Sequence, residues 1–137
     1  MFINSTSLVI PTKERPDRIS KFLNSLGENI FLFNEILIID SSSKTTHINL
    51  KNSLINKKNV RLFNSNPSTS LQRNIGINNY NKNNEFIMFC DDDIIFEKNS
   101  IEYMNKHIEK FSNHAGYGFN LIETPKKNFF DYFKKNR

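Results

Sequence analysis

The chain has 137 residues, a hydrophobic fraction of 37% and a formal net charge of +5 at pH 7. This length suits one domain with a real core and excludes two well-built domains. The single cysteine, Cys90, excludes an intramolecular disulfide framework and provides no zinc-ligand spacing. No apolar run is long enough to cross a bilayer, and the first residues lack the pattern of a signal peptide. We therefore expect a cytoplasmic protein.

The first half of the chain predicts two strands and two helices. An apolar run at residues 7–10, ended by Pro11, predicts the first strand. The helix that follows closes at Gly27, and its apolar face is formed by Ile19, Phe22, Leu23 and Leu26. Residues 36–39 are wholly apolar and predict a second strand that ends at Asp40. A serine turn then leads to a weaker helical segment at residues 45–55.

The second half continues the alternation of strands and helices. We predict a strand at residues 60–63 and a helix at 68–79, with Leu71 and Ile75 on one side. The aromatic-rich run at 86–90 predicts a buried strand, and an amphipathic helix follows at 101–111. Residues 117–122 are predicted as a fifth strand. This order indicates an α/β fold, with a mostly parallel sheet and helices on both faces.

Three consecutive carboxylates, Asp91, Asp92 and Asp93, follow the fourth predicted strand directly. They repel one another, and isolated charges there are costly to desolvate. A bound cation is the usual remedy, and oxygen ligands suit Mg²⁺ or Mn²⁺. Such an ion can hold a diphosphate on its other side. The alternative is a solvated acidic turn that caps the next helix, and the run alone does not decide between the two.

Polar residues also follow the first two predicted strands. Pro11 and Thr12 come after the first strand, and Asp40 and Ser41 come at the end of the second. Ligands of parallel sheets bind outside the carboxyl ends of the strands. We therefore expect these residues and the aspartates to meet at one edge of the sheet.

Four short motifs, in this order, resemble those of family 2 glycosyltransferases, which have the GT-A fold. They are the opening strand with its Pro-Thr turn, a second strand ending in an Asp and serines, an Arg-Asn-x-Gly element on a helix, and an Asp-x-Asp motif. These motifs lie at residues 7–12, 38–43, 72–76 and 91–93. The resemblance extends over almost the whole chain up to about residue 122.

The resemblance implies a nucleotide-sugar donor, often a UDP-sugar, and a bound Mn²⁺ or Mg²⁺ ion. It implies nucleotide-binding roles for Pro11, Thr12, Glu14, Asp40, Ser41, Arg73, Asp91 and Asp92, and metal-binding roles for Asp91 and Asp93. Thr12 and Glu14 would lie near the base and ribose, and Asp40 would contact the uracil. Thr12 and Asp40 equally suit helix-entry and turn positions, and Arg73 equally suits an exposed helix surface.

The implied reaction is metal-assisted, inverting sugar transfer to a glycan or lipid-linked acceptor, as in polysaccharide biosynthesis. Two departures from the family pattern stand out. Ser41 occupies a position where many relatives carry an acidic or amide residue. The family's general base lies well downstream, and no residue after Asp93 matches its motif.

We therefore expect a nucleotide-sugar-binding domain at residues 1–122 and a basic, aromatic segment at 123–137 that begins an acceptor-binding part. The fold would then be truncated before that part, and this chain would transfer sugar poorly alone. The segment suits packing against a missing domain, with self-association as a consequence, or contact with the inner face of a membrane.

Other classes of function remain open at this point. A non-catalytic nucleotide-sugar-binding fragment or an interaction module agrees with the missing base. A signalling receiver domain is disfavoured, because receivers place acidic residues after their first strand, where this chain has residues 11–13. We expect no nucleic-acid partner, because the positive charge lacks a basic-aromatic platform.

Overall fold

The structure is a computed structural model that describes residues 5–97 and 99–120. Its elements, in chain order, are β1 (Thr6–Thr12), α1 (Pro16–Leu26), η2 (Gly27–Leu32), β2 (Glu35–Asp40), α2 (Lys44–Ser53), β3 (Val60–Asn64), α3 (Thr69–Asn79), β4 (Phe86–Phe89) and α4 (Ser100–Lys110). The first four predicted strands and the four predicted helices are all present, with ends within about two residues of those expected. The short 3₁₀ helix η2 was not predicted.

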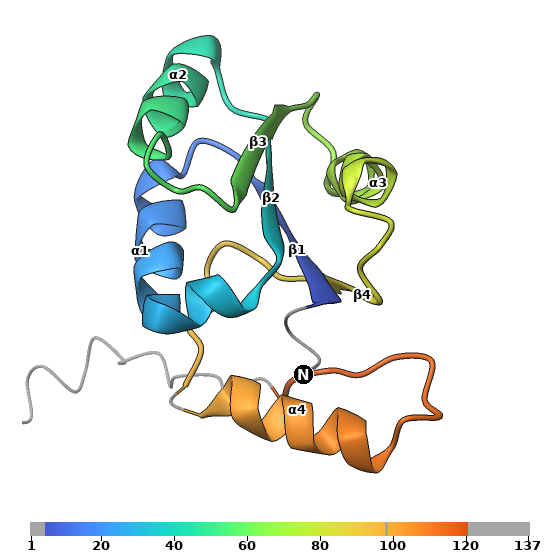
Figure 1. The fold of residues 1–137 in the computed structure, drawn as a ribbon. Helices are drawn as coiled ribbons and strands as arrows, with labels where there is room; N and C mark the ends of the chain where they lie inside the picture. Colours follow the sequence, from blue (N-terminus) through green and yellow to red (C-terminus); the bar gives the residue numbers. More distant parts are fainter. Residues whose placement is uncertain (1–4, 98, 121–137) are drawn as a thin grey trace, which may run out of the picture.

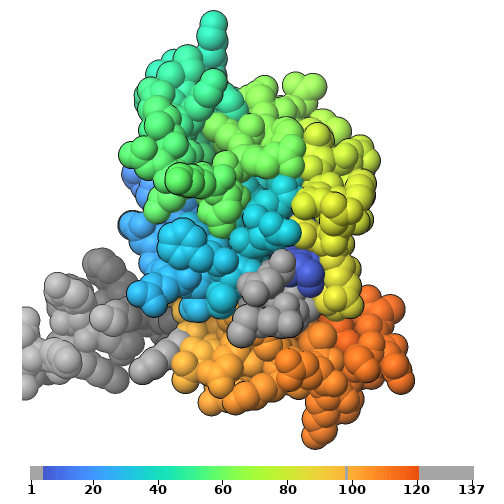
Figure 2. Space-filling view, viewed as in Figure 1, coloured from blue at the N-terminus to red at the C-terminus, as the bar shows by residue number. Residues whose placement is uncertain are grey.

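The described strands form one parallel sheet in the order β3-β2-β1-β4. Helices α1 and α2 cover one face of this sheet, and α3 covers the other (Figure 1). In the space-filling view, α4 and residues 111–120 form the lower part of the described molecule (Figure 2). This arrangement confirms the predicted α/β fold with helices on both faces of a parallel sheet.

The two central strands supply core residues to both faces of the sheet. Leu8 and Ile10 of β1 pack with α1 and α2, whereas Val9 points to the side of α3. Strand β2 alternates in the same way and is buried along its whole length. Successive side chains of a strand point to opposite faces, so a strand covered on both sides reads as a continuous apolar run.

Helix α1 begins and ends where its sequence signals predict. Pro16 stands at the first helical position, where its missing N–H costs no hydrogen bond. Gly27 follows the last helical residue with a φ of +53°, which glycine adopts without steric cost. The buried side of the helix is the predicted apolar face, formed by Ile19, Phe22, Leu23 and Leu26.

The side of α3 that faces the sheet is not centred on Leu71, one of the two apolar residues singled out in the sequence. Leu71 is 40% exposed, and the buried positions are Gln72 and Gly76, with Ile75 packed beside them. A Cβ atom on Gly76 would lie 2.4 Å from Cγ1 of Val9, so the helix approaches β1 at this glycine. Apolar periodicity did not reveal this face, because a small residue and a polar residue make its closest contacts with the sheet.

Strand β4 is less buried than the apolar run at 86–90 predicted. Three of its four residues are half-buried, and Phe89 is 40% exposed. The reason is its place in the described sheet, where β4 pairs on one side only, with β1.

The predicted fifth strand is wrong for residues 117–120, which form no strand. Tyr117 instead donates its hydroxyl to the carbonyl oxygen of Phe111 at 2.6 Å and packs its ring against His107 and His114. Residues 121 and 122, and the predicted segment at 123–137, lie outside the described residues. Among the helices the structure describes, none has the length and apolarity needed to span a membrane.

The amino-terminal end of the sheet holds a buried carboxylate, Glu35, whose side chain is 10% exposed. Its oxygens accept hydrogen bonds from the Ser7 hydroxyl (2.7 Å), the Arg61 guanidinium (2.8 Å) and the Asn81 amide. Burial by itself raises the pKa of Glu35, but the hydrogen bonds from Asn81, Ser7 and Arg61 outweigh it and lower that pKa below 4.5. Glu35 therefore joins β1, β3 and the segment just after α3 as an ionised group.

We predict that Gly76→Ala destabilises the fold. Alanine favours a helix over glycine by about 1 kcal/mol, but overpacking a tight core contact typically costs about 1–3 kcal/mol. The cost of the overlap with buried Val9 should exceed the gain in helix propensity. The variant should therefore have a lower free energy of unfolding, which urea denaturation measures. Val9→Ala should make the Gly76→Ala change less costly, since it removes the methyl groups in the way. Equal costs of Gly76→Ala in both backgrounds would contradict the assigned contact.

We also predict that Glu35→Gln flattens the acid dependence of stability. A carboxylate whose folded pKa is lowered stabilises the fold above its unfolded pKa, and the stabilisation is lost as pH falls through the folded pKa. The variant should lose about 1–3 kcal/mol of unfolding free energy at pH 7, and the difference should shrink toward pH 3. Urea denaturation of both proteins between pH 3 and pH 7 measures the difference in unfolding free energy. Glu28→Gln, at an exposed position, is the control. A constant difference at all pH values would show that ionisation plays no part.

Candidate functional site

The carboxyl ends of three neighbouring strands are tied together by hydrogen bonds. The amide of Ser41, after β2, donates to the carbonyl oxygen of Thr12 at the end of β1, at 3.0 Å. The amide of Cys90, after β4, donates to the carbonyl oxygen of Val9 at 3.1 Å. The structure thus brings Thr12, Ser41 and the aspartates after Cys90 to one edge of the sheet, as predicted.

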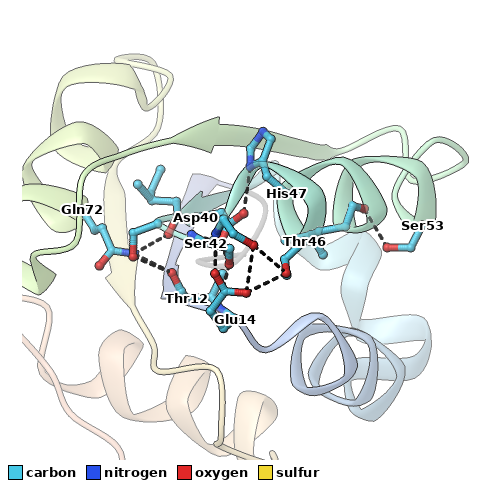
Figure 3. A network of polar contacts seen from close by, with 12 residues as sticks. Thr12, Glu14, Asp40, Ser42, Thr46, His47, Ser53 and Gln72 are labelled. Atoms are coloured by element: carbon cyan, nitrogen blue, oxygen red, sulfur yellow. Dashed lines mark hydrogen bonds and ion pairs between the residues drawn. The ribbon is translucent and has the colours of Figure 1, made fainter.

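Gln72 of α3 closes this edge from the second face of the sheet. Its side-chain amide donates to the carbonyl oxygens of Thr12 (2.8 Å) and Ile39 (2.6 Å), and the residue is 5% exposed (Figure 3). These carbonyls belong to the last residues of the paired strands β1 and β2, and the Gln72 amide gives each of them a side-chain donor. Gln72 is the first residue of the motif at 72–76, and no role was predicted for it. The signal that could have identified Gln72 is a polar residue at a helix position that faces the sheet.

The three consecutive aspartates differ in their surroundings. The Asp92 side chain is 4% exposed, and it accepts hydrogen bonds from the Thr12 hydroxyl (2.6 Å) and the Arg15 guanidinium (3.1 Å). The Asp91 and Asp93 side chains are 60% and 52% exposed. Asp92 therefore fixes the β4 loop to β1, whereas its two neighbours are accessible to a ligand.

Each exposed aspartate pairs with an arginine from a different helix. Asp91 lies 3.2 Å from the guanidinium of Arg73 on α3, and Asp93 lies 3.2 Å from that of Arg18 on α1. Such exposed pairs contribute little to stability. Arg15 and Arg18 were not predicted as site residues. They stand in the loop and the helix that follow the carboxyl end of β1. Ligands of parallel sheets bind outside such strand ends, so this position was a signal for both residues.

A cavity of about 240 Å³ opens at this edge of the sheet. It is lined by Pro11, Thr12, Lys13, Arg15, Thr69, Gln72, Asp91, Asp92 and Asp93. Five predicted nucleotide- or metal-binding residues are thus brought together, whereas Glu14, Asp40, Ser41 and Arg73 are not part of the lining. A second hollow of about 480 Å³ lies at residues 31–34 and 58–59, before β2 and β3, away from the ligand-binding edge.

The structure places Asp40 beneath the edge, with no exposed surface. One carboxylate oxygen accepts from the Ser42 amide (3.0 Å) and the Ser42 hydroxyl, and the other lies 2.8 Å from Nδ1 of His47 on α2 (Figure 3). Asp40 thereby holds the turn between β2 and α2. Its contact with a uracil stays a prediction of the resemblance.

Glu14 is held on the other side of the same turn. Its φ is +52°, an uncommon value for a residue with a side chain. Its amide donates to the Ser42 hydroxyl at 2.6 Å, and its carboxylate accepts from the Thr46 hydroxyl (2.6 Å) and the Ser43 amide (Figure 3). The hydrogen bonds from Thr46 and from Ser43 lower the pKa of Glu14. Glu14 therefore caps the start of α2 and fixes the loop that carries Lys13 and Arg15.

Asp91 and Asp93 have the chemistry required of ligands for Mg²⁺ or Mn²⁺. Within residues 5–97 and 99–120, no three His, Cys, Asp or Glu side chains come together as a complete metal site. Mg²⁺ in nucleotide sites usually takes one or two carboxylates and completes its shell with phosphate oxygens and water. Two exposed carboxylates beside a cavity fit that pattern.

Cys90 takes no part in this chemistry. Burial, together with the charges of Asp91 and Asp93, raises the pKa of its thiol to about 12. The thiol therefore stays protonated at neutral pH and unreactive. It packs against the core, as its position in an apolar run indicates.

An open parallel sheet with a polar cavity across its carboxyl edge defines a ligand-binding α/β domain. The model of glycosyl transferase family 2 matches residues 7–133, and the chain belongs to this family. No curated protein sequence matches the chain.

Solved structures share the fold. Residues 1–349 of S. aureus TarS superpose with a TM-score of 0.64 at 21% identity, covering 85% of this chain and 38% of that one. The same TarS fragment in complex with UDP-GlcNAc gives a TM-score of 0.62 at 21% identity, covering 85% and 37%. The chain therefore spans less than two-fifths of the length of these TarS structures.

We predict that Asp92→Ala destabilises the fold much more than Asp93→Ala does. Asp92→Ala leaves the buried Thr12 hydroxyl without its acceptor and should lower the unfolding free energy by about 1–3 kcal/mol. Asp93→Ala removes only an exposed ion pair and should change it by less than about 0.5 kcal/mol. Urea denaturation at pH 7 compares the two. Similar losses of unfolding free energy in both variants would show that the burial of Asp92 does not give it a structural role that Asp93 lacks.

Proposed function

We propose that this chain is the donor-binding part of a glycosyltransferase that uses a nucleotide sugar, most simply a UDP-sugar. The observation that carries the proposal is the pair of exposed carboxylates, Asp91 and Asp93, on a cavity at the carboxyl edge of a family 2 domain. Support also comes from TarS structures described as complexes with UDP and with UDP-GlcNAc.

The proposed roles of the residues follow their surroundings. Asp91 and Asp93 would hold Mn²⁺ or Mg²⁺, which when bound neutralises negative charge on the diphosphate as the sugar leaves. Asp92 and Thr12 keep this loop in place through their hydrogen bond. Lys13 and Arg15 supply positive charge at the cavity wall. This set of residues can bind and orient a diphosphate.

We propose that the nucleotide base of the donor binds beside the turn after β2. Pro11 and Thr12 line the cavity, and Ser41 is hydrogen-bonded to Thr12. We assign Asp40 and Glu14 the task of shaping this turn, because their carboxylates are occupied by Ser42, His47, Ser43 and Thr46. In this view they support nucleotide binding without reaching the cavity.

The remaining properties of the enzyme are proposals from the family. They comprise inverting transfer to a glycan or lipid-linked acceptor in polysaccharide biosynthesis, in the cytoplasm or at the inner face of the membrane. The proposed division into 1–122 and 123–137 belongs with them. The chain spans 38% of the TarS fragment, so the acceptor side and its base are expected in segments beyond those described.

A second candidate is a donor-binding domain without transferase activity of its own. All three carboxylates that line the cavity are paired with arginines, so none is placed as an unengaged general base. The first proposal places the acceptor side and the base outside the described residues, so the two proposals separate in a longer protein that joins this domain to an acceptor-binding part. Incubated with a UDP-sugar and candidate acceptors, that protein gives a glycosylated product only under the first proposal.

We predict that UDP binds weakly to this chain and more tightly with Mn²⁺. Asp93→Ala should abolish the effect of Mn²⁺ while leaving the fold intact, because the ion would lose one of two carboxylate ligands. Calorimetry with and without Mn²⁺ measures both binding constants, with Glu28→Ala as a control away from the cavity. If UDP binds equally with and without Mn²⁺, the metal assignment is wrong.

A further inference from the structure

Three arginines surround the three consecutive aspartates, and each takes a different partner. Arg15 lies just before α1, Arg18 within α1, and Arg73 within α3. They pair with Asp92, Asp93 and Asp91 at 3.1, 3.2 and 3.2 Å. The acidic run is therefore neutralised residue by residue, by cations from two helical segments that cover opposite faces of the sheet (Figure 1).

The three pairs are not equivalent. Asp92 is buried and also holds the Thr12 hydroxyl, so its pair with Arg15 is part of the fold. In the other two pairs, every side chain is between 43% and 60% exposed. Exposed pairs of this kind are weak, because water competes for both partners. Only the pairs of Arg18 and Arg73 can open at little cost.

A divalent cation and these arginines compete for the same carboxylates. Arg73 lies on Oδ1 of Asp91, and Arg18 lies on Oδ2 of Asp93. A cation bound between Asp91 and Asp93 would also repel guanidinium groups about 3–4 Å from its ligands, since charge interactions at that distance remain appreciable near a protein surface. Occupation by the cation and occupation by both arginines are thus mutually disfavoured.

We propose that Arg18 and Arg73 are exchangeable counter-ions of the donor site. They hold Asp91 and Asp93 while the site is empty, leave them when a divalent cation binds, and then donate to phosphate oxygens of the donor. This inference rests on the proposed function. Guanidinium groups suit the second role because they bind phosphate in a bidentate manner.

The proposal has a thermodynamic consequence. The cation releases two phosphate-binding groups, so it should increase the affinity for a diphosphate by more than its own charge provides. Linkage requires that the diphosphate increases the affinity for the cation by the same factor. Arg18 and Arg73 would therefore set the coupling between metal and nucleotide, in addition to the affinity of either one.

The test measures Mn²⁺ binding by electron paramagnetic resonance, first with Mn²⁺ alone and then with saturating UDP. The proteins are the wild type, Arg18→Gln, Arg73→Gln and the double variant. Lys21→Gln removes one exposed positive charge from α1 and is the matched control. Arg73→Lys keeps the charge without the forked donor and serves as a milder variant.

Each Arg→Gln change should tighten binding of Mn²⁺ alone, by about 1.5- to 5-fold, because a weak competing ion pair is removed. The same change should weaken UDP binding in the presence of Mn²⁺, so the coupling factor falls and falls furthest in the double variant. Arg73→Lys should lie between the wild type and Arg73→Gln, and Lys21→Gln should match the wild type.

The outcomes separate this inference from the proposed function. If the wild type shows coupled Mn²⁺ and UDP binding that the arginine variants leave unchanged, only the counter-ion role is overturned. Weaker binding of Mn²⁺ alone in both Arg→Gln variants would overturn it too. If neither the wild type nor any variant binds Mn²⁺ or UDP, the donor site itself is wrong and this inference falls with it.

Discussion

The carboxyl end of β1, at Thr12, is the point on which the rest of the site depends. Its carbonyl oxygen accepts from the Ser41 amide and the Gln72 side chain, and its hydroxyl donates to Asp92. One residue thus joins the turn after β2, the inner side of α3 and the loop after β4. Because parallel strands end at the same edge, a single residue at the centre of the sheet can connect all three.

The charges at this edge divide into a buried set and an exposed set. Asp40 and Asp92 are buried and hydrogen-bonded to their surroundings, so they maintain the shapes of the two turns. Asp91 and Asp93 are exposed and held only by weak ion pairs. A buried carboxylate is costly to uncouple from its partners, whereas an exposed one can change partners. This difference suits the second pair to a ligand.

The opposite end of the sheet is stabilised in a comparable way around Glu35. Its ion pair with Arg61 and its hydrogen bond from Ser7 link three segments of the chain, and Asn84 extends the network by donating to Ser7. Each end of the central strands thus carries a polar network, with an apolar core on both faces between them. The carboxyl end combines its network with a polar cavity and exposed carboxylates.

The sequence by itself determined the order and type of the main elements and the edge at which the polar residues meet. Continuous apolar runs, the spacing of Ile19 to Leu26 and the position of Gly27 were sufficient, because these signals are local. The structure alone decided that Gln72 and Gly76, and not Leu71, face the sheet, and that Asp92 is buried between exposed neighbours. It alone revealed the arginine partners of the aspartates. Those outcomes depend on contacts between residues about 18 to 80 positions apart, which no local pattern encodes.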